Sequence, residues 1–507
     1  MTCFARRFPR VFRLFLIAAA VVVGSAAESL AGELKIGGAT VSITPDRPVA
    51  LSGQMHTRIA REVESPATAT ALAIESHEGE KVLDQAIMVS CDLVAIREGI
   101  LEEVRAKLKE QIPDFDVQKI FLSATHTHTA PVMAEGRYEI PKEGVMQPAE
   151  YADFLVERVV EASVKAWKGR EPGAVGWGLG HAVVAQNRRA VYADGHAQMY
   201  GKTNPNDFRG IEGYEDHGVE VLFFWDEDHK LIATAINVAC PSQEVEGRSA
   251  VNADFWHQVR ALLRQRHDDD LLVLGWAGAA GDQSPHLMFR KDAEERMRKL
   301  RGLDRLDELA MRIVAAWEEA YAGARQEIRP DAKLVHTVKT IELPVRAVTD
   351  DEVANARKQV EELSKDPVAK RRMLWYQAVV DRYEQQQAGP VDPYAMELHV
   401  LRLGDVAIAT NSFELFTEYG IRMKSRSPAL QTFVIQLTGP GTYLPTAEAV
   451  AGGGYSAIVE SSVVGPQGGD ALVEQTLNTL DTLWSEPRSR RTLLRHSRSF
   501  SLVSGSR

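Results

Sequence analysis

Cysteine, basic charge and long hydrophobic runs are all scarce in this 507-residue sequence. Its three cysteines are too few for a disulfide framework in a chain of this length. The formal net charge of −11 disfavours a general nucleic-acid-binding protein, which would present a basic face. Hydrophobic residues make up 45% and charged residues 25%, which is typical of a folded globular protein and excludes a disordered or fibrous chain. The composition therefore leaves a large, acidic, soluble globular protein.

The first 31 residues have the pattern of a secretory signal peptide. Four arginines precede an apolar run over residues 14–23, and small residues follow up to Ala31. A membrane anchor is the alternative, but this run is far shorter than the ~20 apolar residues that span a bilayer. No later segment is long and apolar enough to do so. We therefore expect cleavage near Ala31 and a mature protein that is secreted or periplasmic and has no transmembrane helix.

The last residues, 487–507, contain six arginines and no acidic residue. They include several serines and lack a hydrophobic period, so we expect a basic, disordered tail rather than an arm that binds polyanions. Residues 32–486, between the two ends, are expected to form the folded domain.

Short runs typical of β-strands alternate with helical patterns along the chain. The expected strands cover residues 71–75, 86–90, 119–123, 219–225, 231–239, 271–276, 398–403 and 406–410. The expected helices cover residues 96–109, 151–167, 254–266, 306–320 and 467–484. Residues 350–387 are rich in charged residues and glutamine, and predict a solvated helical excursion from the main body. This alternation predicts an α/β protein with mixed central β-sheets flanked by helices.

Two histidines follow the end of the strand expected at 119–123. His126 and His128 are two residues apart and are flanked by threonines. Extended backbone places the side chains of residues i and i+2 on the same side, so both imidazoles can converge on one metal ion or one substrate bond. A single histidine is more often structural, but this pair is more typical of a functional site.

Cys240 ends the strand expected at 231–239 and precedes a proline. A thiolate is a good zinc ligand, whereas a buried cysteine can equally be an inert small hydrophobic residue. Cys91 is the only other cysteine that remains after cleavage of the signal peptide, and the two could form a disulfide in an oxidising compartment. The segment by itself leaves these three roles open.

Residues 275–286 are rich in glycine and alanine and follow another expected strand. Glycine at this density allows the backbone to approach a ligand closely and to present its N–H groups. Ser284 within this segment could be a nucleophile, or it could cap a tight turn. The pattern is not the G-x-S-x-G nucleophile elbow.

The fourth group of polar residues lies near the C-terminal end of the domain. Glu414 follows an apolar strand and is expected to open a helix, where an acidic side chain also complements the helix dipole. Tyr443 and Tyr455 lie in glycine-rich loops that are more typical of ligand contact than of a core. Taken together with the histidines and Cys240, these residue types suffice for a zinc site with a hydrolytic water.

The ordered set of motifs resembles the N-terminal catalytic domain of the neutral (non-lysosomal) ceramidase family. The matching segments are residues 124–131 (Ala-Thr-His-Thr-His-Thr-Ala-Pro), 187–188 (Asn-Arg), 239–241 (Ala-Cys-Pro), 281–285 (Gly-Asp-Gln-Ser-Pro), 413–414 (Phe-Glu) and 441–446 (Gly-Thr-Tyr-Leu-Pro-Thr). The likeness spans roughly residues 34–486, and its most specific pieces are His-Thr-His and Gly-Asp-x-Ser-Pro. It implies the family's α/β catalytic domain without the C-terminal β-sandwich. It also implies hydrolysis of the amide bond of N-acylsphingosines at a zinc ion.

The resemblance implies a zinc ligand set. His126, Glu414 and Tyr443 look like family ligands, and Cys240 stands where the family has its second ligand histidine. Because cysteine is an ordinary zinc ligand, we expect Zn²⁺ to be held by all four side chains. A disulfide between Cys91 and Cys240 is then not expected.

The resemblance also implies four catalytic residues. His128 resembles the histidine that handles protons at the scissile amide, and Arg188 resembles an arginine that contacts the substrate. Tyr455 resembles a tyrosine near the developing oxyanion. Ser284 matches a serine in the position of a nucleophile, although a zinc-activated water is the simpler attacking group.

We therefore predict an exported, zinc-dependent hydrolase that cleaves the amide bond of a ceramide-like or other N-acyl substrate. The expected partner is a small-molecule or lipid-like amide; peripheral contact with a membrane is compatible with it, and no nucleic acid is expected. Two alternatives use the same motifs. One is a catalytically degenerate protein that binds a lipid or glycan, which the cysteine at position 240 would favour, and the other is an esterase or lactonase with the same zinc site. The sequence leaves the oligomeric state undetermined.

Overall fold

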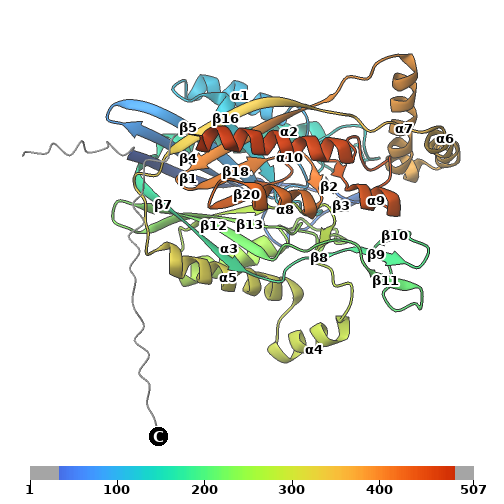
Figure 1. The fold of residues 1–507 in the computed structure, drawn as a ribbon, viewed down its shortest axis with the longest axis horizontal. Helices are drawn as coiled ribbons and strands as arrows, with labels where there is room; N and C mark the ends of the chain where they lie inside the picture. Colours follow the sequence, from blue (N-terminus) through green and yellow to red (C-terminus); the bar gives the residue numbers. More distant parts are fainter. Residues whose placement is uncertain (1–32, 486–507) are drawn as a thin grey trace, which may run out of the picture.

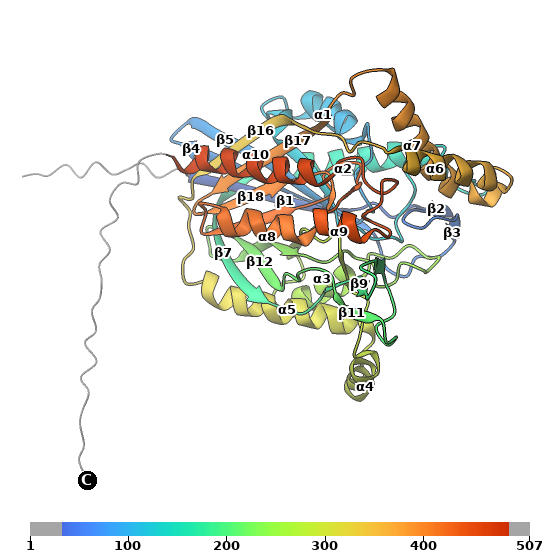
Figure 2. The ribbon, with the colours of Figure 1, turned by 45° about the vertical axis from the view of Figure 1, so that its right-hand side comes forward.

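A computed structural model describes residues 33–485, which form four layers (Figure 1). Two β-sheets pack face to face in the middle, and helices cover the outer face of each sheet (Figures 1 and 2). The expected signal peptide and the expected basic tail lie outside the described residues.

The larger sheet has eight strands in the order β14-β13-β12-β7-β1-β4-β5-β6. These strands are β1 (Glu33–Ser42), β4 (Thr68–Glu78), β5 (Lys81–Cys91), β6 (Ile120–Ala124), β7 (Glu171–His181), β12 (Gly218–Asp226), β13 (Leu231–Val238) and β14 (Leu272–Ala277). Neighbouring strands pair antiparallel in the centre of the sheet. At its two edges, β13 pairs with β14 and β5 with β6 in parallel. The sheet is therefore mixed.

The smaller sheet has four strands in the order β16-β17-β18-β20. These strands are β16 (Leu334–Leu343), β17 (Tyr394–Leu403), β18 (Val406–Thr410) and β20 (Gln431–Ile435). Apolar side chains from both sheets form one buried core between them, where the rings of Trp276 and Phe433 meet edge to face with centroids 6.1 Å apart. Burial of apolar side chains in such a core is the main stabilising contribution to the folding of a domain.

Six amphipathic helices cover the outer faces of the two sheets. The larger sheet is covered by α1 (Ile100–Gln111), α2 (Pro148–Lys168), α3 (Phe255–Arg266) and α5 (Arg305–Ala324), and the smaller sheet by α8 (Thr417–Arg426) and α10 (Pro466–Trp484). In α2, for example, Tyr151, Leu155 and Val159 recur at every fourth position and are buried on one side of the helix. Each strand and helix expected from the sequence is present, with end points that shift by a few residues.

The remaining elements are short or lie at the periphery. The short strands are β2 (Val49–Leu51), β3 (Arg58–Ala60), β8 (Gln186–Asn187), β9 (Arg189–Tyr192), β10 (Ala197–Met199), β11 (Phe208–Ile211), β15 (Gln283–Ser284), β19 (Glu414–Leu415) and β21 (Tyr443–Leu444). The other helices are α4 (Lys291–Arg301), α6 (Asp350–Leu363), α7 (Lys370–Ala388), α9 (Ala447–Gly452) and the 3₁₀ turns η1 (Val117–Lys119) and η2 (Pro367–Ala369). In Figures 1 and 2, α4 projects from the lower side and the α6–α7 pair from the right-hand side.

Four strands of the two main sheets, β1, β7, β16 and β20, were not expected from the sequence. In β7 four of the eleven residues are glycine, and glycine weakens a strand. Tertiary packing explains these glycines. A Cβ atom on Gly180 would lie 2.0 Å from the carbonyl oxygen of Ala316, and one on Gly178 would lie 2.6 Å from that of Ala320. The glycines therefore allow α5 to lie directly against the backbone of the sheet.

Glu414 also departs from its expected local structure. The residue lies in strand β19 and not at the start of a helix, since α8 begins three residues later, at Thr417. The prediction that Glu414 opens a helix is wrong, because parallel pairing with β21 holds this segment extended.

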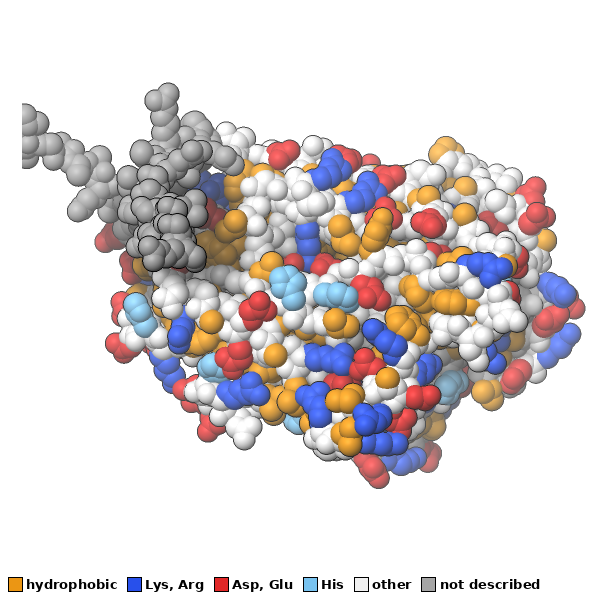
Figure 3. Space-filling model, turned by 60° about the horizontal axis from the view of Figure 1, so that its bottom comes forward, with side chains coloured by type: hydrophobic (Ala, Val, Ile, Leu, Met, Phe, Trp, Pro, Cys, Tyr) orange, Lys and Arg blue, Asp and Glu red, His pale blue; other side chains and the backbone are white. Residues whose placement is uncertain are grey.

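Both described cysteines are free and buried, in different parts of the core. Cys91 packs under α1 and α2, whereas Cys240 packs under α3 and α5, so they form no disulfide. Across residues 33–485, no helix combines the length and apolar composition that crossing a bilayer requires. The face shown in Figure 3 carries acidic and basic side chains interspersed with one another.

A buried pair of histidines connects the two sheets. The Nε2 atom of His336 on β16 lies 2.9 Å from Nδ1 of His399 on β17, and the Nδ1 atom of His336 lies 3.1 Å from the carbonyl oxygen of Gln85 on β5. Burial lowers the pKa of His336 well below 6.5, and the neighbouring His399 acts in the same direction. His336 is therefore uncharged in the folded protein at neutral pH.

This burial predicts a loss of stability in mild acid. Below pH 6.5 the unfolded chain binds a proton on His336 that the folded chain does not, so the free energy of unfolding should decrease by up to about 1.4 kcal/mol per pH unit from this group. In His336→Asn this contribution is absent, and urea unfolding between pH ~6.5 and ~4.5 should show a shallower decrease than the wild type. His56→Asn, at an exposed histidine, should follow the wild type. Equal slopes for His336→Asn and the wild type would contradict the argument.

Candidate functional site

His126 follows β6 in a strained backbone conformation. Its φ angle is 69°, in the left-handed region that non-glycine residues rarely adopt, and such strain is often found at functional sites. The ring Nδ1 lies 2.6 Å from the carbonyl oxygen of Val94, to which it donates. This hydrogen bond directs Nε2 to Oε2 of Glu414, 3.2 Å away.

Two short parallel strands bring Glu414 and Tyr443 together. In the pairing of β19 with β21, Glu414 lies directly beside Tyr443. Burial alone would raise the pKa of Glu414, but His126 and the Tyr443 hydroxyl lower it to about 2. Burial and the neighbouring Glu414 raise the pKa of Tyr443 well above 10. The carboxylate is therefore ionised, and the free phenol keeps its hydrogen.

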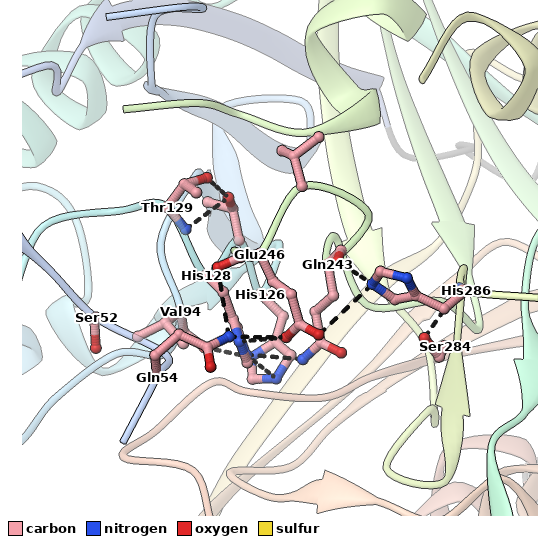
Figure 4. Close-up of polar contacts among 12 residues, drawn as sticks. Ser52, Gln54, Val94, His126, His128, Thr129, Gln243, Glu246, Ser284 and His286 are labelled. Atoms are coloured by element: carbon pink, nitrogen blue, oxygen red, sulfur yellow. Dashed lines mark hydrogen bonds and ion pairs between the residues drawn. The ribbon is translucent and has the colours of Figure 1, made fainter. Parts of the chain in front are cut away.

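Arg188 fixes the orientation of Gln243 and, through it, the hydrogen on His128. The Nη1 atom of Arg188 donates to Oε1 of Gln243 at 3.1 Å, so the amide nitrogen of Gln243 faces away. That nitrogen lies 2.8 Å from Nε2 of His128 (Figure 4). An amide nitrogen can only donate, so Nε2 of His128 is the acceptor and its ring hydrogen is on Nδ1.

Glu246 holds the other side of the His128 ring. Its Oε2 lies 3.1 Å from Nδ1 of His128, although the pair is not aligned as a full hydrogen bond (Figure 4). The Nε2 atom of Gln54 donates to the same carboxylate oxygen at 3.2 Å. Burial lowers the pKa of His128 below 6.5, and the contact with Glu246 acts in the opposite direction. His128 is thus a neutral base supported by a carboxylate.

Gly53, in the loop after β2, packs directly against the His128 ring. Its φ angle is +101°, and a Cβ atom built on it would lie 2.5 Å from Cγ and 2.6 Å from Cβ of His128. Glycine is therefore required here for two reasons, the positive φ and the close approach. The backbone of this loop therefore contacts the His128 ring and limits where the ring can lie.

These side chains line one cleft of about 110 Å³, hereafter the His126 cleft. His126, His128, Glu414, Tyr443 and Tyr455 all border it. The rings of Tyr443 and Tyr455 meet edge to face with centroids 5.6 Å apart. Burial raises the pKa of Tyr455 to about 12, so its hydroxyl is available as a hydrogen-bond donor. The structure thus brings together five of the eight residues expected from the sequence, and Arg188 joins them by donating to the Tyr443 hydroxyl at 3.1 Å.

Cys240 and Ser284 lie apart from this cleft. The thiol of Cys240 packs in the core and donates to the carbonyl oxygen of Pro241 at 3.5 Å. Burial raises its pKa well above 9, so it is a neutral thiol and not a thiolate. Ser284 lies in β15, with its hydroxyl 3.0 Å from that of Tyr200. Neither residue borders the His126 cleft.

The donor set can be tested against zinc. His126 lies close to both His128 and Glu414, with Nε2–Nε2 at 3.4 Å and Nε2–Oε2 at 3.2 Å. The ionised Glu414 carboxylate and Nε2 of His128 both accept, so a cation or a proton on Nε2 of His126 would satisfy these contacts. Within residues 33–485 no three His, Cys, Asp or Glu side chains form a metal-binding group, and Cys240 therefore does not join His126 and Glu414. With Tyr443 as the third donor, the site fits the open three-ligand type that catalytic zinc uses.

Several residues of the site were not expected from the sequence. Gln243 and Glu246 follow the Cys240 turn, where their clustering with other polar residues was the available signal. Arg97, Arg137 and Arg371 also line the cleft, but they are isolated arginines in three distant segments with no motif around them. Only the folded chain brings these three together.

Comparison with known proteins gives a match by structure and none by sequence. No family model matches the chain, and no curated protein sequence matches it. The crystal structure of neutral ceramidase from Pseudomonas aeruginosa matches with a TM-score of 0.66 and 16% identity, over 89% of this chain and 74% of that one. A ceramidase complexed with C2 matches with a TM-score of 0.63 and 16% identity, over 89% of this chain and 75% of that one.

These matches bear on the fold predicted from the motifs. The mixed central sheets flanked by helices are confirmed, and so is the resemblance at the level of architecture. At 16% identity the likeness is one of fold. The chain therefore has the fold of the neutral ceramidases, as a divergent example of it.

Proposed function

We propose that the protein is a zinc-dependent hydrolase of ceramidase type that cleaves an amide bond in an N-acyl substrate. The observation that carries this proposal is the convergence of His126, Glu414 and Tyr443 with the His128–Glu246 pair at one cleft. The fold shared with neutral ceramidase supports the same reaction class.

His126, Glu414 and Tyr443 are the proposed zinc ligands, and Cys240 is left out of the set. The buried neutral thiol has its contacts in the core, whereas the other three present N and O donors toward one another. Bound zinc supplies a positive charge that polarises a carbonyl group and makes a water molecule more acidic. Arg188 supports this arrangement by donating to the Tyr443 hydroxyl, which favours the phenolate form that a metal would select.

His128 is the proposed proton-transfer residue. Its Nε2 carries the ring's lone pair, which accepts from the Gln243 amide, and borders the cleft. In the reaction the attacking water takes the place of that amide as the donor and passes its proton to Nε2. The same atom can then deliver that proton to the amide nitrogen as the C–N bond breaks. Glu246 stabilises the imidazolium in between, because its carboxylate faces Nδ1.

Tyr455 is the proposed donor to the oxyanion. Its pKa of about 12 keeps the hydroxyl protonated, and the residue borders the cleft beside Tyr443. Arg188 acts through Tyr443 and Gln243, which makes it a positioning residue. Ser284 has no part in the proposed reaction, since its hydroxyl is engaged with Tyr200.

Export is also part of the proposal. The basic start, short apolar run and small residues of the first 31 positions support cleavage of a signal peptide and a secreted or periplasmic location. Mass spectrometry of the secreted or periplasmic fraction should find a mature N-terminus near residue 32.

Metal analysis tests the ligand set. The purified protein should contain about one zinc per chain, and His126→Ala should lose that zinc together with at least ~10²-fold in hydrolysis of N-acyl amides. Cys240→Ala should keep the zinc, because the thiol lies in the core. His181→Ala, at an exposed histidine, is the matched control and should resemble the wild type.

Two results of this experiment would contradict the proposal. Loss of zinc in Cys240→Ala with the fold intact would restore the thiol to the ligand set. A metal-free wild type with undiminished hydrolysis would remove zinc from the mechanism. Faster cleavage of a matched ester than of the amide would instead favour the esterase or lactonase alternative.

Gly53→Ala tests the positioning of His128. The added methyl group would overlap the His128 ring and displace it, which should reduce kcat by about 10²-fold and leave the zinc content unchanged. Gly79→Ala is a matched control, since Gly79 has a φ of +62° but no atom within 4 Å of the added Cβ. Both variants place a side chain at a positive φ, so a decrease in kcat shared by both would argue against the steric explanation.

A further inference from the structure

Three arginines border the His126 cleft, and each comes from a different segment. Arg97 lies in the loop between β5 and α1, Arg137 in the loop between β6 and α2, and Arg371 in the first turn of α7. All three are partly buried. The cleft that holds the proposed reaction centre is therefore also a cluster of positive charge.

The guanidinium groups have few partners within the protein. Arg97 donates through Nη1 to the carbonyl oxygen of Pro440. Within residues 33–485, Arg137 and Arg371 make no hydrogen bond or ion pair through their side chains. Guanidinium groups that are partly withdrawn from water normally have such partners, since leaving them unpaired costs free energy.

Like charges face one another across the cleft. Burial lowers the pKa of Arg97 to about 9, and the neighbouring Arg137 and Arg371 act in the same direction. Glu414 is the acidic side chain that borders the cleft, and its carboxylate is already engaged by His126 and Tyr443. A bound anion would remove this imbalance.

The α6–α7 pair has a structural role in building the cluster. Lys370 on α7 forms an ion pair at 2.6 Å with Glu139, two residues after Arg137. The Trp375 ring, also on α7, packs against Tyr455 with centroids 5.7 Å apart. The segment expected to be a solvated excursion is therefore attached to the rim of the cleft and brings Arg371 there.

The His126 cleft is small, and few apolar side chains line it. Its volume of about 110 Å³ is below the 300–1,000 Å³ typical of pockets for drug-sized ligands. The apolar side chains that border it are Met55, Val94, Ala95, Leu437 and Pro440. Such a space suits a compact charged group better than the long hydrocarbon chains of an N-acylsphingosine.

We propose that Arg97, Arg137 and Arg371 bind a carboxylate of the substrate, and that the substrate class is an N-acyl amino acid. Arginine pairs with carboxylates through two parallel hydrogen bonds, which makes it well suited to this group. This inference rests on the proposed amide hydrolysis. In the reaction, the amide C–N bond breaks, water supplies the oxygen of the new carboxylic acid, and a proton passes to the leaving nitrogen to give a free amino acid.

Two probes of equal size test the inference on the full-length protein. N-acetylglycine carries the carboxylate, and N-acetylglycinamide carries a neutral amide in its place. Titration calorimetry on the wild type should give about tenfold tighter binding of N-acetylglycine. In Arg371→Gln, and independently in Arg137→Gln, the two affinities should agree to within about twofold, with zinc content unchanged.

Arg372→Gln is the matched control. It makes the same change of charge on the next residue of α7, which is exposed and does not border the cleft, so it should keep the wild-type preference. Equal binding of both probes by the wild type would overturn the inference. So would a preference that persists in both Arg371→Gln and Arg137→Gln.

The hydrolysis of the same probes separates this inference from the proposed function. Preferential binding of N-acetylglycine without release of glycine would leave the carboxylate site intact and contradict amide hydrolysis. Equal hydrolysis of both probes would support amide hydrolysis and overturn the carboxylate site.

Discussion

The buried guanidinium of Arg188 joins the parts on which the site depends. It donates to the carbonyl oxygen of Gly281 at 2.9 Å, to the Tyr443 hydroxyl at 3.1 Å and to Oε1 of Gln243 at 3.1 Å. These contacts connect the turn before β15, strand β21 and the turn after β13. Because a guanidinium can only donate, it determines which end of the Gln243 amide faces His128, and so which ring nitrogen of His128 carries the hydrogen.

The balance of charge in the cleft has consequences beyond the reaction centre. Glu414 is held ionised by His126 and Tyr443, and within residues 33–485 none of the three arginines at the rim forms an ion pair with a carboxylate. A neutral lipid amide would not relieve this excess of positive charge, whereas a carboxylate would. The fold shared with neutral ceramidase does not by itself fix the substrate class, because the side chains that border the cleft decide which ligand it accepts.

Local patterns predicted eight of the twelve strands in the two main sheets and five of the six helices that cover them, because their apolar periodicity reflects burial in the core. Strand β7 was not predicted, because its local sequence lacks the apolar pattern of a strand. Its glycines are selected by the close approach of α5, a contact with residues more than a hundred positions away. The same limit applies to Glu414, where pairing with Tyr443 outweighed the local preference for a helix start.

The sequence by itself determined the α/β class, the order of the elements and the candidates His126, His128, Glu414, Tyr443 and Tyr455, since each follows a recognisable strand or lies in a glycine-rich loop. Tertiary structure alone decided that Cys240 packs in the core, that Gln243 and Glu246 hold His128, and that three distant arginines meet at one cleft. The physical reason is that side-chain direction and charge proximity depend on the packing of segments remote in sequence, which no local pattern records.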